Sequence, residues 1–276
     1  MKNNVKTFRL FVRSDKDDEK RKSQQIAETI RELNKRTAHP LIESDNADLV
    51  IAIGGDGTFI DAVTSTNFSK EIIYTGIHTG TLGFLQDLCE NDIFSLIQYI
   101  NFEEELKTRK VYTGSIDVFL KDGNILHFFA LNEVLVAGDN YSKIQFGEYI
   151  NNELLQNVTA SGIIIATSTG DTAHSLNANG AINLSNNCQL VCTLIHTIKN
   201  AVNENFISNP IVCSKINLEL QPGNNISVTI DGITKDVDSN SIERVEVSML
   251  DSNYINKLDL MNYSKVRVIR EKILGY

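Results

Sequence analysis

The stretch that decides the fold is Asp48-Leu-Val-Ile-Ala-Ile-Gly-Gly-Asp-Gly-Thr58. Its apolar part is typical of a strand buried on both faces of a parallel sheet. The strand ends abruptly in Gly54-Gly55-Asp56-Gly57-Thr58, and residues 59–63 then have a helical pattern. Glycines leave backbone N–H groups uncovered, and a helix N-terminus attracts negative charge. The sequence therefore predicts a phosphate-binding turn, with a plain tight turn capped by aspartate as the alternative.

The aspartate inside this turn needs an explanation, because its charge repels phosphate. Asp56 makes sense there if it accepts a proton from an attacking hydroxyl group or holds Mg²⁺. We therefore take Asp56 as the candidate catalytic residue. The candidate phosphate-binding residues are Gly54, Gly55, Gly57 and Thr58.

Strand-like and helix-like segments alternate through the first hundred residues. Thr7–Val12 and Glu71–Ile77 are predicted strands, and Asp17–Lys35 is a predicted helix. Asn91 is the predicted cap of a further helix that ends near Ile100. Alternation at this spacing predicts a doubly wound α/β unit.

From about residue 111 the pattern changes to short strands separated by hairpin signals at 122–124, 151–152 and 221–225. One helical stretch is predicted at 187–203, and the tail from Tyr263 to Leu274 has no clear type. The sequence thus predicts an α/β N-terminal domain, residues 1–100, and an all-β-rich C-terminal domain, residues 101–250. Residues 251–276 are a candidate to pack back on the first domain.

Composition narrows the possible partners. The chain has 276 residues and a net charge of −9, which argues against nucleic acid as a partner. No apolar run approaches the roughly 20 residues that would span a membrane. The N-terminal residues are polar and charged, which predicts no signal peptide and a cytoplasmic location.

The cysteines predict no special chemistry. Four of them are too few and too scattered for a disulfide framework in a chain of this length. Cys188, Cys192 and His196 would share one face of the predicted helix. We interpret them as core residues rather than metal ligands, because no second ligand pair accompanies them.

Three segments extend the pattern of the glycine turn. They are Gly76-Ile-His-Thr-Gly-Thr-Leu-Gly-Phe-Leu85, Leu131-Asn-Glu-Val134, and Ser161–Leu176 followed by Gly180-Ala181. The turn alone resembles that of NAD kinases, 6-phosphofructokinases, and diacylglycerol and sphingosine kinases. With the three segments in this order and at this spacing, roughly residues 45–240 resemble the NAD kinase family.

The resemblance implies a two-domain NAD kinase architecture with the active site in a crevice between the domains. It implies NAD and ATP as substrates, Mg²⁺ with ATP, and assembly into homodimers or homotetramers. Asp56 would take the proton from the ribose 2′-hydroxyl, Asn132 and Glu133 would hydrogen-bond the adenosine, and Phe84 would line the adenine pocket. The other implied binding residues are Thr159, Ser161, Thr172, Ala173, His174 and Asn177.

Some of these residues have plainer interpretations. Asn132-Glu133 alone would be an ordinary pair at a strand edge, and Phe84 a core residue. Asp231-Gly232 between two short strands is a good two-residue hairpin turn, which we favour over a ligand role. Family members nevertheless place this Asp-Gly pair near the dimer seam and the bound dinucleotide.

The chain also departs from the family pattern. The substituted positions are Ser161 for Asp, Thr159 for a basic or imidazole residue, Ser168 for Pro, Asp171 for Ser, and His174 for Tyr. These changes remove a charge and an aromatic ring from the wall that holds the far half of NAD. These changes motivate one alternative, a degenerate NAD- or NADP-binding paralogue without turnover. The glycine turn leaves a second alternative, a lipid kinase that shares it, although the acidic chain without a membrane-docking surface counts against that one.

Overall fold

The computed structural model describes residues 4–12, 17–80, 83–139, 142–185, 187–198 and 206–275. The chain divides into two compact units. The N-terminal unit contains residues 1–111 and 254–276, and the β unit contains residues 112–253. The predicted α/β and β-rich fold classes are confirmed. Within the described ranges, no helix is long and apolar enough to cross a membrane.

The N-terminal unit is built on a parallel sheet in the order β2-β1-β3-β4. Its strands are β1 (Thr7–Val12), β2 (Ile42–Glu43), β3 (Leu49–Gly54) and β4 (Ile73–His78). The end of β16 (Ile242–Leu258) adds to the edge of the sheet, where Asn256 and Lys257 pair with β4. Every residue of β3 is buried, as its apolar run predicts.

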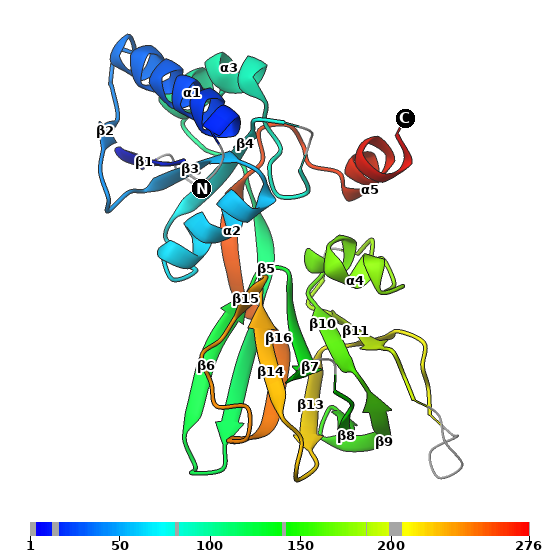
Figure 1. Ribbon diagram of the computed structural model, residues 1–276. Coiled ribbons are helices and arrows are strands. Elements are labelled where there is room, and N and C mark those ends of the chain that lie inside the picture. The colour runs from blue at the N-terminus through cyan, green and yellow to red at the C-terminus, as the bar shows by residue number, and fades with distance from the viewer. Residues whose placement is uncertain are drawn as a thin grey trace. The chain divides into compact units, whose positions relative to one another are not determined.

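Helices cover both faces of this sheet (Figure 1). Alternate residues of β3, including Leu49 and Ile51, pack with Ile26 of α1 (Asp17–Lys35) and Leu96 of α3 (Ile93–Phe102). The residues between them on β3 face the opposite side, where α2 (Asp56–Ser65) packs against β3 and β4. The predicted doubly wound arrangement is confirmed.

The start of α3 differs in detail from the prediction. A short 3₁₀ turn, η1 (Glu90–Asp92), precedes the helix, and the N-cap residue is Asp92 rather than Asn91. The Asp92 carboxylate accepts the N–H of Cys89 at 2.8 Å. The Asp92 side chain, one residue after the predicted cap, therefore holds the 3₁₀ turn, because this turn shifts the start of the α-helix.

The β unit contains two antiparallel sets of strands. One set has the order β12-β11-β10-β7-β14-β15, and in the other β16 is followed by β13, β8 and β9, while β5 pairs with β16 and β6. The first set is β7 (Glu133–Gly138), β10 (Gly162–Ala166), β11 (Leu190–Ile195), β12 (Ile211–Cys213), β14 (Ile226–Ile230) and β15 (Ile233–Thr234). The second adds β5 (Thr108–Leu120), β6 (Ile125–Ala130), β8 (Ile144–Ile150), β9 (Glu153–Ala160) and β13 (Lys215–Leu220). Their inward side chains form one core, which includes Val136, Ile163 and Val245.

The turn signals have mixed outcomes. Residues 122–124 join the paired strands β5 and β6, and residues 151–152 join β8 and β9, as predicted. Residues 221–225 do not form a hairpin, because β13 and β14 pair with other strands and lie in different sets. The tail is helical, with α5 (Lys265–Ile269) followed by a π-helical turn, η4 (Arg270–Leu274).

The helix predicted at 187–203 is wrong. Residues 190–195 form β11, which pairs with β10 on one side and β12 on the other. Cys188, Cys192 and His196 therefore do not share a helix face. Cys192 is buried with its sulfur 3.7 Å from that of Cys213, and the Cys188 thiol donates to Asp251. The last residues of the predicted helix, 199–203, lie outside the described residues.

Candidate active site

The glycine turn forms at the carboxyl end of β3, where Gly54 has φ of 155°. A Cβ atom at Gly54 would lie 2.4 Å from Thr58 Oγ1, so only glycine fits. The N–H groups of Thr58 and Phe59 donate to the Gly55 carbonyl at 3.0 and 3.3 Å, which closes the turn into α2. The chain therefore enters the helix directly from the strand, as the sequence predicts.

Gly55 is a glycine that packing does not require. Its φ of −99° suits any residue, and a Cβ atom there would meet nothing within 4 Å. The following amides of Asp56 and Gly57 belong to the first turn of α2, where N–H groups have no acceptor within the helix. The bare backbone at Gly55 thus leaves an uncovered set of donors at the positive end of a helix.

The Asp56 carboxylate is held by the loop that follows β4. The N–H of Phe84 donates to Oδ2 at 2.9 Å, and the N–H of Leu85 donates to Oδ1 at 3.0 Å. A Cβ atom at Gly83 would lie 2.1 Å from Oδ1, so the glycine lets the loop approach this closely. Lys272 Nζ lies 3.3 Å from Oδ2. The segments 54–58 and 83–85 therefore meet at one carboxylate.

Two buried polar atoms border the same turn. Gln86 donates a short hydrogen bond to the Gly55 carbonyl, while its Oε1 has no partner among the described residues. Thr58 Oγ1 is also buried and without a partner in that part of the chain. Buried polar groups are normally hydrogen-bonded, so these two atoms beside the turn remain able to form further hydrogen bonds.

In the β unit, Asn132 and Glu133 lie at the start of β7. The Asp231 carboxylate accepts the N–H groups of Leu131, Asn132 and Glu133 at 2.7, 2.7 and 3.1 Å. Asp231 and Gly232 both have positive φ, and Ile230 pairs with Ile233 across them, so the predicted hairpin turn is confirmed. The turn aspartate thereby fixes the backbone that carries Asn132 and Glu133.

Glu133 is a buried carboxyl group with an unpaired atom. Its side chain is largely buried, and Oε2 has no partner among the described residues. Burial, with a smaller contribution from the negative charge of Asp231, raises its pKa to about 7. The group can therefore donate or accept a hydrogen bond near neutral pH.

The loop after β10 packs against Asn132. Thr167 Oγ1 donates to the Leu131 carbonyl at 2.6 Å, and a Cβ atom at Gly170 would lie 2.0 Å from the Asn132 carbonyl. The loop leads through Thr172 and Ala173 into the short helix α4 (His174–Asn177), on which His174 and Asn177 are exposed. Buried Asp171, one of the departures, accepts the N–H of Asn183 at 2.6 Å.

Thr159 lies near the end of β9, and Ser161 joins β9 to the end of β10 that is remote from Glu133. Gly162 pairs with Ala137 and Ala166 pairs with Glu133, so the strand separates Ser161 from Glu133 by about 16 Å at ~3.3 Å per residue. Thr159 is buried, and its side chain accepts from Gln145 Nε2 at 3.3 Å. Within the β unit, these two residues do not join the group formed by Asn132, Glu133 and the 167–177 loop.

Comparison with known proteins identifies the relatives of this chain. Residues 3–104 match the ATP-NAD kinase N-terminal domain, and residues 131–255 match the ATP-NAD kinase C-terminal domain. An NAD kinase from Chloroherpeton thalassium is 30% identical over 207 residues, which are 70% of this chain and 68% of that protein. The chain belongs to the NAD kinase family.

Other members of the family differ in length. An NAD kinase from Streptococcus pneumoniae is 29% identical over 248 residues, which are 89% of this chain and 88% of that protein. A bifunctional NADP phosphatase/NAD kinase from Methanocaldococcus jannaschii is 32% identical over 188 residues, and the match spans only 32% of it. Yeast NADH kinase, solved with NADH, has the same fold, with a TM-score of 0.80 at 19% identity, covering 99% of this chain and 88% of that chain.

The structure adds three residues that the sequence patterns of the family did not reveal. Gln86 follows directly on the segment 76–85, and this neighbourhood is the signal that could have found it. For Asp231 the sequence favours a hairpin turn, and its contact with residues 131–133 does not show in the sequence because it spans about a hundred positions. Lys272 lies in a tail without any motif, and no local signal points to it.

Proposed function

We infer that this chain transfers the γ-phosphoryl group of ATP to the adenosine-ribose 2′-hydroxyl of NAD, giving NADP. The observation that carries this inference is the carboxylate of Asp56, which two backbone amides hold at a glycine turn with uncovered N–H donors. A phosphate-binding turn with an oriented carboxylate suits a kinase whose acceptor is an alcohol. Membership of the NAD kinase family supplies the dinucleotide as the acceptor.

Asp56 serves as the base in this proposal. A carboxylate offers about four lone-pair positions, and the two amides and Lys272 engage three of them. One position remains to take the proton of the 2′-hydroxyl as its oxygen attacks the γ-phosphorus. The amides of Phe84 and Leu85 keep the carboxylate oriented. Positioned bases of this kind contribute about 10²–10⁴-fold to the rate.

The uncovered amides of the glycine turn bind phosphoryl oxygens. Gly54, Gly55, Gly57 and Thr58 provide this turn at the N-terminus of α2, whose ten residues give it a partial positive charge. The charge of a loose transition state spreads over the transferred oxygens, where fixed donors stabilise it most.

Asn132 and Glu133 bind the adenosine of the acceptor. The amide side chain of Asn132 can both donate and accept, and Glu133 has an unpaired buried oxygen. Phe84 offers its half-buried ring to the adenine, beside the amide that it donates to Asp56. The remaining assigned contacts come from Thr172, Ala173, His174 and Asn177.

The residues present fit a divalent cation that arrives with the nucleotide. Among the residues that the structure describes, no group of three or more His, Cys, Asp or Glu side chains could hold a metal ion. Mg²⁺ usually binds through one or two carboxylates together with substrate phosphates. In this proposal the cation would be held through those phosphates, because the one open position on the Asp56 carboxylate receives the proton of the 2′-hydroxyl. Bound Mg²⁺ would neutralise charge on the triphosphate.

Thr159 and Ser161 are assigned to the far half of a dinucleotide, although Ser161 lies about 16 Å along β10 from Glu133. An extended NAD molecule covers part of such a distance. In an assembly, a second copy of the chain can bring its own Thr159 and Ser161 to the dinucleotide. We therefore propose a homodimer or homotetramer as the assembled form.

The test is formation of NADP by the purified chain with Mg-ATP and NAD, read by an NADP-specific dehydrogenase. Asp56→Asn is the matched control, since it keeps the shape of the side chain. NAD binding in calorimetry without NADP formation would instead indicate a paralogue that binds dinucleotides without turnover. Phosphorylation of diacylglycerol vesicles in place of NAD would identify a lipid kinase.

A further inference from the structure

The C-terminal tail brings a cation to the candidate base. Lys272 lies in η4, with its Nζ 3.3 Å from Asp56 Oδ2 and 4.4 Å from the centre of the Phe84 ring. Its side chain keeps 32% of its surface exposed. The ammonium group therefore touches both the carboxylate and the aromatic ring of the loop that holds it.

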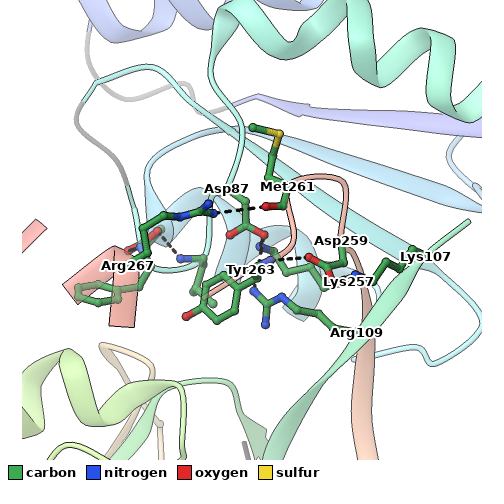
Figure 2. Close-up of polar contacts among 11 residues, drawn as sticks. Asp87, Lys107, Arg109, Lys257, Asp259, Met261, Tyr263 and Arg267 are labelled. Carbon is green, nitrogen blue, oxygen red and sulfur yellow. Dashed lines mark hydrogen bonds and ion pairs between the residues drawn. The ribbon is translucent and has the colours of Figure 1, made fainter. Parts of the chain in front are cut away.

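The tail is anchored by a buried ionic cluster in the same unit (Figure 2). Lys257, near the end of β16, is fully buried and forms a close ion pair with Asp87. Arg109 Nη2 lies 3.6 Å from the same carboxylate, and its guanidinium stacks 3.7 Å from the Tyr263 ring. The cluster connects the loop after β4 to the first residues of the tail.

Further contacts continue the anchor toward Lys272. The Tyr263 N–H donates to Asp259 at 2.7 Å, and Arg267 donates to the Met261 carbonyl at 3.5 Å. Val268 of α5 is buried at 4% exposure. The path of the tail is thus fixed by contacts that do not involve Lys272, so Lys272 is presented by a held segment.

The ion pair itself does little for the fold. An ion pair with about a third of its surface exposed is screened by water and contributes little to stability. An ammonium group has three N–H donors, and Asp56 takes one of them. Two donors remain at the Asp56 carboxylate, and Asp56 is the first residue of α2 after the glycine turn. In that place a cation offsets the repulsion between Asp56 and an anionic substrate.

We propose that Lys272 binds the phosphoryl group under transfer, as a side-chain donor to the oxygens of the nucleoside triphosphate. The proposal rests on the proposed function, because it assigns a ligand to the same Asp56 site. The Phe84 ring and the Asp56 carboxylate hold the ammonium in position before the nucleotide arrives. When phosphate binds, the remaining N–H groups donate to its oxygens, and the charge of the ammonium stabilises them.

The test compares Lys272→Met with Arg270→Met, which removes the same charge from an exposed position in the same turn. Lys272→Met should raise the KM for ATP or lower kcat, with a loss in kcat/KM for ATP of about ten- to 100-fold. The KM for NAD should stay within a few-fold of wild type. Lys272→Arg should restore part of the loss, and Arg270→Met should match wild type. Thermal unfolding verifies that all variants are folded.

Calorimetry with inorganic tripolyphosphate gives a readout that does not depend on turnover. Wild type should bind it about tenfold or more tightly than Lys272→Met. Suppose that wild type makes NADP, and that Lys272→Met binds tripolyphosphate and turns over as well as Arg270→Met does. Then the proposed role of Lys272 is wrong and the proposed function stands. If wild type makes no NADP, the proposed function fails, and the tripolyphosphate titration still decides on Lys272. A faster Lys272→Met enzyme would show a blocking contact and would also overturn the proposal.

Discussion

The buried carboxyl group of Glu133 should make the stability of the protein depend on pH. Its largely buried side chain has an oxygen without a partner in the described part of the chain, and the negative charge of Asp231 acts on it. Both features disfavour the ionised form, which raises the pKa of Glu133 to about 7. Glu133→Gln keeps the shape of the side chain and removes the titration.

The size and sign of the effect follow from this pKa. A rise in pKa from 4.5 to about 7 corresponds to about 3.5 kcal/mol, at ~1.4 kcal/mol per pKa unit. Because the folded protein holds this proton more tightly than the unfolded chain, folding is favoured at low pH. The contribution of Glu133 is fully present below about pH 4.5 and is lost as the pH rises through 7. Above that point the folded protein carries the cost of a buried charge.

The assay is urea unfolding at pH 5, 6, 7 and 8 for wild type, Glu133→Gln and Glu243→Gln. Glu243 is exposed on β16 and serves as the matched control. The free energy of unfolding of wild type should fall relative to Glu133→Gln by up to about 3 kcal/mol between pH 5 and pH 8. The control should follow wild type. Parallel profiles for wild type and Glu133→Gln would refute the argument, since they would mean that Glu133 is ionised in the folded protein at every pH tested.

Three further outcomes are expected. Asp56→Asn should remain folded, bind NAD, and lose at least about 10²-fold in NADP formation, and turnover within a few-fold of wild type would remove Asp56 from the mechanism. Asn132→Ala should raise the KM for NAD more than the KM for ATP, at a cost of about 1–3 kcal/mol, while equal effects on both would make the residue structural. Gly55→Ala should fold and lose phosphate binding, whereas Gly54→Ala should unfold at lower urea because its Cβ collides with Thr58. Equal stability of Gly54→Ala and Gly55→Ala would contradict the expected collision with Thr58.

The glycine turn after β3 could be predicted from the sequence because its signals are local. The buried run of β3, the glycines after it and the helix that follows are contiguous in the chain, and each agrees with the others. The two-residue turn at Asp231-Gly232 is equally local. Where one short segment fixes both the strand and the turn, pattern and structure coincide.

The remaining features depend on contacts that the sequence does not display. The six residues of β11 are a short apolar run, which periodicity alone cannot assign to helix or strand, and its neighbours β10 and β12 decide the outcome. The separation of Ser161 from Glu133 appears only in the register of β10 with β7. Lys272 reaches Asp56 across 216 positions, because a buried ionic cluster directs the tail.

Two aspartates perform the same structural task, and they differ in whether a substrate can reach the carboxylate. Asp56 accepts the amides of residues 84 and 85, and Asp231 accepts those of residues 131–133, so each carboxylate ties a candidate binding segment to the end of a strand. Burial raises the pKa of Asp231, and three backbone donors occupy its two oxygens. Asp56 keeps 25% of its side chain exposed, and beside it lie a cation and an uncovered glycine. Since a base must reach its substrate, Asp56 can act on a hydroxyl group, whereas Asp231 can only hold the backbone that carries Glu133.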